Sequence, residues 1–306
     1  MNFTWTSPHG RTLPRICERT LIMGVINVTP DSFSDGGLHP VPEDAANHAF
    51  RLASEGADII DVGGESTRPG HSPISMEDEL HRVLPAIAAI RQRCPALPIS
   101  IDTSKPEVAE AAIIAGADVI NDVTGLTGGV PVEALRAASL RVRAGIEAGD
   151  LPRSPMAESV AHLDCPVIVM HPATSDRRGN FWTEILADIR VYLTLARNAG
   201  VREDQLWIDP GFGFGKTVEE NLELLKNLDR LAVLGHPVLL GTSRKSTIGR
   251  VLDRPVDQRF EGTAATLVWG IARGCHMVRV HDVAALRSTI RMADAISRGL
   301  SYLPST

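Results

Sequence analysis

The sequence predicts a single α/β domain folded as a TIM (β/α)8 barrel. Short apolar runs alternate with helical patterns about eight times along the 306 residues, and strands that alternate with helices pair in parallel through right-handed crossovers. Each apolar run ends in a polar residue, which is where barrel enzymes carry their active sites. The length also fits, because one such barrel commonly takes about 250 residues.

The chain begins with an irregular or hairpin-like N-terminal segment at residues 1–20, and the barrel is expected over residues 21–300. The first strand, at 21–26, ends at Asn27 and leads into a loop rich in turn-forming residues. A helix then runs from Pro42 to about residue 55, because proline suits the first turn of a helix.

Seven further strands are expected from the remaining apolar runs. They lie at residues 56–62, 98–101, 116–122, 166–170, 206–208, 237–241 and 276–280. Helices are expected over about 75–93, from 104, over about 131–141 and 183–199, from 217, and over 246–273 and 283–298. Capping-box spacing marks three of the helix starts, at Ser75, Ser104 and Thr217. Beyond the expected helix near 131–141, the chain up to 164 is interpreted as a polar connecting segment.

Composition narrows the class of protein. The net charge of −6 argues against non-specific nucleic-acid binding. The N-terminus lacks the apolar core of a signal peptide, and no apolar run reaches the roughly 20 residues that cross a bilayer. A cytoplasmic protein without a membrane partner is therefore expected. Cys17, Cys94, Cys165 and Cys275 lack zinc-site spacing and are expected to be buried reduced thiols.

Every expected strand ends in at least one polar or charged side chain. These side chains are Asn27, Asp61, Asp102, Asn121, His171, Asp209, Ser243 with Lys245, and Arg279 with His281. Because the carboxyl ends of barrel strands meet at one face, the residues together predict a binding site. Any one of them could instead reflect ordinary strand-to-loop polarity, and Asp61 could serve as a structural hydrogen-bond partner.

The polar residues divide into two groups by chemistry. The first suits a flat heterocycle, since a carboxylate accepts two parallel N–H bonds, an amide donates and accepts, and a lysine donates. This group comprises Asp102, Asn121, Asp209 and Lys245. The second suits a polyanion, since guanidinium groups pair with phosphate oxygens and an amide oxygen can ligate Mg²⁺. This group comprises Arg68, Arg279, His281 and Asn27.

The glycine-rich run GFGFGKT at residues 211–217 does not predict a nucleotide site. A P-loop requires glycine at the position of Pro210, and a Rossmann fingerprint requires glycine or alanine at the position of Lys216. We expect a loop with positive-φ glycines that places Phe214 against a flat ligand.

Several unbroken runs carry a resemblance to a known family. They are NVTPDSFSDGG (27–37), DVGGESTRPG (61–70), DTSKPEV (102–108), IND (120–122), DPGFGFGK (209–216), SRKSTIG (243–249) and RVHDV (279–283). In these runs the chain resembles the dihydropteroate synthases, over about residues 21–295. The resemblance implies a TIM-barrel transferase of folate biosynthesis. Such an enzyme condenses (7,8-dihydropterin-6-yl)methyl diphosphate with p-aminobenzoate, requires Mg²⁺, and is usually a homodimer.

The resemblance also implies roles for residues at matching positions. The pterin edge would contact Asp102, Asn121, Asp209 and Lys245, with apolar contacts from Met170 and Phe214. Mg²⁺ would bind Asn27, and the diphosphate would contact Thr67, Arg68, Arg279 and His281. The p-aminobenzoate pocket, which sulfonamides occupy in this family, would include Phe33, Pro69 and Ser243. Asp102, Lys245 and Arg279 are the expected catalytic residues.

The chemistry of the implied reaction favours a dissociative displacement. An aryl amine is largely unprotonated at neutral pH and needs little activation, so the barrier lies in C–O cleavage and in the charge that grows on the diphosphate. Mg²⁺ and two arginines can stabilise that charge. The electron-rich dihydropterin can share positive charge at the methylene, and Asp102 can stabilise the cationic ring.

Two segments depart from the family pattern. Residues 172–180 differ from the usual stretch after the fifth strand, and the segment at 141–164 is longer than usual. Two alternative functions are weighed beside the synthase. One is a folate-dependent methyltransferase, which should lack the diphosphate-binding residues that are all present here. The other is a non-catalytic pterin-binding paralogue, which should lose its loop motifs first, whereas the motifs here are intact.

Overall fold

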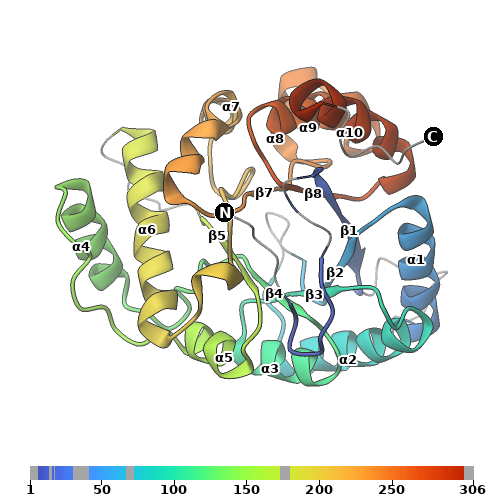
Figure 1. The fold of residues 1–306 in the computed structure, drawn as a ribbon, viewed down its shortest axis with the longest axis horizontal. Helices are drawn as coiled ribbons and strands as arrows, with labels where there is room; N and C mark the ends of the chain where they lie inside the picture. Colours follow the sequence, from blue (N-terminus) through green and yellow to red (C-terminus); the bar gives the residue numbers. More distant parts are fainter. Residues whose placement is uncertain are drawn as a thin grey trace.

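A computed structural model of the chain confirms the barrel. The structure describes residues 6–13, 16, 18–29, 41–66, 72–172 and 180–299. Eight parallel strands form one sheet in the order β6-β5-β4-β3-β2-β1-β8-β7, and a parallel bridge between Ile208 and Val238 joins its two ends. The helices surround the strands (Figure 1). Within the described ranges, no helix is both long enough and apolar enough to span a membrane.

The described elements follow the alternation expected from the sequence. The strands are β1 (Leu21–Asn27), β2 (Ile59–Gly63), β3 (Ile99–Asp102), β4 (Val119–Asp122), β5 (Val167–Met170), β6 (Leu206–Asp209), β7 (Leu239–Leu240) and β8 (Met277–Val280). The α-helices are α1 (Pro42–Glu55), α2 (Met76–Arg93), α3 (Pro106–Ile114), α4 (Val132–Arg143), α5 (Pro155–Leu163), α6 (Phe181–Ala199), α7 (Val218–Lys226), α8 (Ser246–Leu252), α9 (Phe260–Ala272) and α10 (Val283–Arg298). Short 3-10 helices are η2 (Glu203–Gln205), η3 (Leu228–Leu234) and η4 (Val256–Gln258).

Apolar side chains fill the barrel from its N-terminal end. The inner cluster consists of strand residues together with two residues of the N-terminal segment, Leu13 and Ile16. That segment also forms an antiparallel bridge between Thr6 and Thr12. Burial of these side chains removes apolar surface from water and stabilises the closed end. Polar groups inside the barrel are therefore concentrated toward the opposite, carboxyl end of the strands.

Buried ion pairs reinforce the N-terminal end. Asp118, just before β4, is fully buried and accepts hydrogen bonds from Arg11 Nε and Arg91 Nη2, each at 2.8 Å. The Ile99 N–H donates to the same carboxylate at 2.9 Å. Removal of one partner of a buried pair leaves an uncompensated charge, which costs about 3–5 kcal/mol. This cluster thus ties the N-terminal segment to α2 and β4.

Of the three expected capping boxes, the one at Thr217 is confirmed, the one at Ser75 is confirmed in part, and the one at Ser104 is wrong. Ser75 Oγ accepts from the Asp78 N–H at 3.0 Å, and Thr217 forms the full reciprocal box with Glu220. Helix α3 begins instead after Lys105, with no side-chain cap. Proline at the first helical position needs no N–H partner, which explains why α3 can start without the cap.

The interpretation of the whole segment up to residue 164 as polar and non-helical beyond α4 was wrong. Residues 155–163 form helix α5. Pro155 stands at the start of the helix, where its fixed φ is favourable, and Ser154 Oγ accepts from the Ala157 N–H at 3.1 Å. The expected buried thiols are confirmed for Cys94, Cys165 and Cys275, whereas Cys17 lies outside the described residues.

Candidate active site

The strand register brings the expected site residues to one end of the barrel. Asn27 at the end of β1 pairs with Gly63 of β2, and Gly63 pairs with Asp102 of β3. Asp102 pairs in turn with Asn121 of β4. Farther round, Met170 of β5 pairs with Asp209 of β6. Asn27, Asp102 and Asn121 therefore lie at one level across the mouth of the barrel, with Gly63 between the first two.

Arg279 on β8 joins several of these residues. Its Nε donates to Asp61 Oδ2 at 2.6 Å, and its Nη2 donates to Asp102 Oδ2 at 2.9 Å. Asn121 Nδ2 donates to the same Asp61 oxygen at 3.1 Å. Asp61 is fully buried, and its Oδ1 has no hydrogen-bond partner among the described residues. Asp61 thus joins Arg279 to Asn121, and Arg279 extends the network to Asp102.

Burial sets the charges in this network. It raises the pKa of Asp102 to about 7, against the lowering effect of Arg279, and the Asp61 carboxylate adds to the rise. Burial alone would lower the pKa of Arg279, but Asp61 and Asp102 outweigh it and the pKa is raised. Arg279 therefore stays cationic, while the buried Asp102 carboxylate is more readily protonated than an exposed aspartate.

A second group lies at the ends of β6 and β7. Asp209 is 7% exposed and its Oδ1 accepts from the Gly211 N–H at 2.7 Å; burial raises its pKa. Lys245 Nζ lies 3.8 Å from the centroid of the Phe214 ring. Burial, and then Arg279, lower the pKa of Lys245 to about 8, despite the opposing effects of Asp209 and Asp102. The group combines a carboxylate, an ammonium donor and an aromatic face.

The loop after β6 has the glycine conformations expected from the sequence. Gly211 has a φ of +69°, and a Cβ there would lie 2.0 Å from the His171 carbonyl oxygen, so only glycine fits. Lys216 is buried, and its Nζ donates to the His171 and Gly211 carbonyls at 3.1 and 2.9 Å. The lysine of this run therefore fastens the loop to β5.

Ser243 and His281 lie together at the ends of β7 and β8. Their Oγ and Nδ1 atoms are 2.9 Å apart, and Ser243 is only 5% exposed. A hydrogen bond thus joins Ser243, which is expected to contact p-aminobenzoate, to His281, which is expected to contact the diphosphate. The Ser243 hydroxyl already has this partner, so direct contact with an aryl amine would require a shared hydrogen bond.

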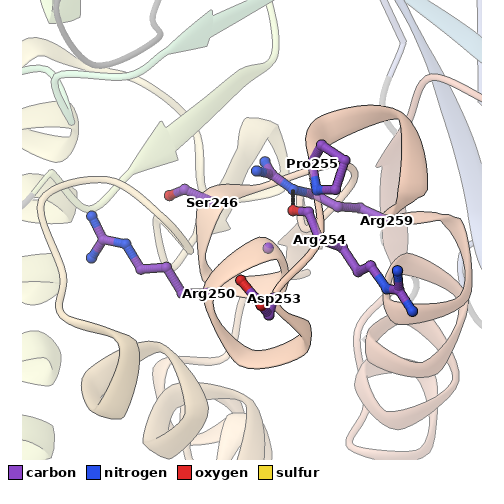
Figure 2. A pocket seen from close by; sticks show the side chains of 7 residues that line it. Ser246, Arg250, Asp253, Arg254, Pro255 and Arg259 are labelled. Atoms are coloured by element: carbon purple, nitrogen blue, oxygen red, sulfur yellow. Dashed lines mark hydrogen bonds between the residues drawn. The ribbon is translucent and has the colours of Figure 1, made fainter.

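A surface cavity of about 440 Å³ lies along the outer face of α8 (Figure 2). Its lining includes Ser246, directly after Lys245, and three arginines, Arg250, Arg254 and Arg259. Arg259 Nη1 donates to the Arg244 carbonyl at 2.9 Å, which holds the guanidinium in place. Asp253 is the one carboxylate among the lining residues, so the lining is positively charged on balance, in contrast to the acidic chain as a whole.

Four expected contact residues, Thr67, Arg68, Phe33 and Pro69, lie outside the described residues. The sequence left Asp61 as either a site residue or a structural hydrogen-bond partner, and in the structure it accepts hydrogen bonds from two site residues, Asn121 and Arg279. Its partner Arg279 is 218 positions away, so no local spacing could have revealed the contact. Its position at a strand end was the one available signal.

The donor set at β1 fits Mg²⁺ bound mainly through a phosphorylated substrate. Among the described residues, no cluster of three or more His, Cys, Asp or Glu side chains could hold a metal ion. Mg²⁺ commonly takes one or two protein oxygens, with phosphate oxygens and water completing an octahedron. Asn27 offers one amide oxygen at the end of β1, beside Gly63 of the next strand.

Comparisons with known proteins agree with this geometry. Residues 23–281 match the family described as pterin binding enzyme. Dihydropteroate synthase of Clostridium beijerinckii is 44% identical over 284 residues, which cover 92% of this chain and 96% of that protein. The Xanthomonas albilineans dihydropteroate synthase, solved with 4-aminobenzoic acid, is 40% identical, with a TM-score of 0.82 over 98% of this chain and 100% of that one. The Yersinia pestis enzyme, solved with a sulfonamide drug, is 36% identical, with a TM-score of 0.79 over 96% and 98%.

Proposed function

Because the chain belongs to the dihydropteroate synthases, transferases of folate biosynthesis within the pterin-binding family, we propose that it joins a pterin to p-aminobenzoate. The amine nitrogen forms a bond to the methylene carbon of (7,8-dihydropterin-6-yl)methyl diphosphate, and the C–O bond to the diphosphate breaks. The amine proton passes to solvent, and the products are 7,8-dihydropteroate and pyrophosphate. The observation that carries this proposal is the buried network of Arg279 with Asp61 and Asp102.

The two groups of polar residues supply complementary contacts for the pterin. The Asp209 carboxylate can accept parallel N–H bonds from the amidine-like edge, while Lys245 and Asn121 donate to ring acceptors. Phe214, under the Lys245 ammonium, and Met170 offer apolar surface to the ring. Burial of these groups strengthens each contact, because the local dielectric is low.

We propose a dissociative displacement at this site. C–O cleavage leaves positive charge that the dihydropterin shares, and ionised Asp102 stabilises it electrostatically. Arg279, whose guanidinium is held between Asp61 and Asp102, stabilises the departing diphosphate together with His281, Thr67 and Arg68. Asn27 would hold Mg²⁺, which neutralises charge on the diphosphate. Prompt positional isotope exchange within the diphosphate, without p-aminobenzoate, would support this order of events; its absence would refute it.

For the second substrate we propose a pocket that includes Phe33, Pro69 and Ser243. The Yersinia pestis relative was solved with a sulfonamide drug, and sulfonamides should compete with p-aminobenzoate here too. We also propose a homodimer through outer helices, since large apolar side chains are exposed on α8, η4 and α9. These are Val251, Leu252, Val256, Phe260, Val268 and Trp269. Sedimentation at micromolar concentration would reveal a monomer if this proposal is wrong.

Pyrophosphate release tests the proposed function. We expect turnover only when the pterin diphosphate, p-aminobenzoate and Mg²⁺ are all present, and loss of turnover when the metal is chelated. Turnover without p-aminobenzoate would contradict the proposed condensation. Tight pterin binding by calorimetry without any turnover would identify a non-catalytic paralogue instead.

The pH dependence of kcat/KM should be bell-shaped. Activity should fall below about pH 7 as the Asp102 carboxylate takes up a proton, and above about pH 8 as the Lys245 ammonium loses one. Lys245→Arg should remove the alkaline limb, because a guanidinium does not titrate in this range. An alkaline limb that survives in this variant would show that another group causes it.

A further inference from the structure

We propose that Lys105 is a charge-balancing residue for the diphosphate end of the site, acting through Glu65 and Glu79. Lys105 Nζ donates to Glu65 Oε2 at 2.5 Å and to Glu79 Oε2 at 2.6 Å. One ammonium thus serves two carboxylates, and the cluster carries a net charge of −1. Without the lysine the same cluster would carry −2. The inference rests on the proposed function, because it concerns recognition of the diphosphate.

The cluster lies beside the row of strand ends that is expected to bind the substrate. Glu65 comes two residues after Gly63, which pairs with both Asn27 and Asp102. Lys105 comes three residues after Asp102 and directly precedes α3. Glu65 and Lys105 therefore follow strand ends that pair with the end of β1, the proposed Mg²⁺ position, and uncompensated negative charge in this region would repel a polyanion.

The surrounding contacts hold Glu65 in this position. Arg82 Nη1 donates to the Gly64 carbonyl at 2.9 Å. A Cβ at Gly64 would lie 2.7 Å from a methyl carbon of Val83, so the chain passes unusually close to α2 there. The backbone just before Glu65 is thus held against α2, while the Glu65 carboxylate itself is held by Lys105.

The surroundings of Lys105 favour its charged form. Burial alone would lower its pKa, but the hydrogen bonds and charges of Glu65 and Glu79 outweigh burial and raise it. Glu79 is 1% exposed, and its Oε1 has no hydrogen-bond partner among the described residues. A buried carboxylate in this state depends on a nearby cation. The cluster is therefore a fixed arrangement of charge rather than a surface ion pair.

Lys105→Met tests the inference with two probes, the pterin diphosphate and the corresponding 6-hydroxymethyl pterin without phosphate. We expect KM for the diphosphate to rise about tenfold, as expected for an added like charge at a binding site, and calorimetric affinity for the uncharged pterin to stay within about twofold. Lys105→Met/Glu65→Gln restores the net charge of −1 and should return KM to within about threefold of wild type. Lys105→Arg should behave like wild type.

Two controls separate charge from structure. Arg197→Met removes one positive charge from an exposed ion pair with Glu203, outside the site. It should change neither KM for the diphosphate nor the affinity for the uncharged pterin. Glu65→Gln alone keeps the Lys105–Glu79 pair, so it should fold even if Lys105→Met does not, and should lower KM for the diphosphate. Any of four results would overturn the inference. KM for the diphosphate could rise in Glu65→Gln, or stay unchanged in a folded Lys105→Met. Lys105→Met could lose affinity equally for both probes, or the double variant could fail to recover the wild-type KM.

The proposed function can fail separately. If the wild-type protein releases no pyrophosphate, calorimetry with the two probes still compares their affinities in wild type and variants. A preference for the diphosphate that Lys105→Met reduces would then support the charge-balancing role without catalysis. Equal affinity for both probes in the wild-type protein would refute that role.

Discussion

Replacement of Arg279 by alanine should lower kcat/KM for pyrophosphate release by about 10³-fold, mainly through kcat. Loss of a preorganised donor at a site of developing charge typically costs 10² to 10³ in rate. Here the loss is compounded, because Asp61 and Asp102 lose the guanidinium that donates to both. Without that cation the pKa of Asp102 should rise above about 7, and the carboxylate would be protonated at neutral pH. Steady-state kinetics with the pterin diphosphate measures the effect.

Arg279→Ala should also destabilise the protein, so a matched control is needed. Asp118→Asn weakens a buried ion cluster with Arg11 and Arg91 at the opposite end of the barrel. Both variants should unfold at lower urea concentration, but only the first should lose activity per folded molecule. Arg279→Lys should recover little activity, since one ammonium cannot reproduce a fork between two carboxylates. Retention of more than about a tenth of the activity in Arg279→Ala would show that the network is structural.

The fold and the strand ends could be predicted because they depend on local patterns. Apolar runs that end in polar residues, such as the run before Asp209, reflect strand burial followed by exposure at the barrel mouth. Parallel pairing then brings these ends together whatever their distance in the sequence. The glycine loop could be predicted because glycine adopts positive φ readily, whereas the close approach of Gly211 to the His171 carbonyl appears only in the structure.

What could not be predicted depends on contacts between distant residues. Asp61 is ambiguous alone, and becomes the common partner of Arg279 and Asn121 only when β8 closes against β1. Lys105 was part of a recognised run, but nothing local indicated that it would meet Glu65 and Glu79. Helix α5 was missed for another reason: Pro155 reads as a breaker, although it is favourable at a first turn.

The second large effect is expected from Asp209→Asn, which should raise KM for the pterin diphosphate by about 10³-fold. The asparagine oxygen can still accept from the Gly211 N–H, as Asp209 Oδ1 does at 2.7 Å, so the loop should keep its place. The other oxygen becomes an NH₂ group that faces the donor edge of the pterin. A site built to hydrogen-bond its substrate rejects an analogue that lacks the matching group by about 10⁴ to 10⁵, which sets an upper limit on the loss. Calorimetry with the pterin alone measures the loss directly.

The pattern of constants separates this residue from Arg279. In the proposed site Asp209 would contact the pterin in both ground and transition states, so its loss should appear in KM, whereas the loss of Arg279 should appear in kcat. Asp209 also raises the pKa of Lys245, so Asp209→Asn should move the alkaline limb below about pH 8. KM for p-aminobenzoate should not change. If KM for the pterin diphosphate stays within about threefold of wild type while Asp118→Asn behaves as expected, Asp209 does not read the pterin edge, and the heterocycle must bind elsewhere in the barrel mouth.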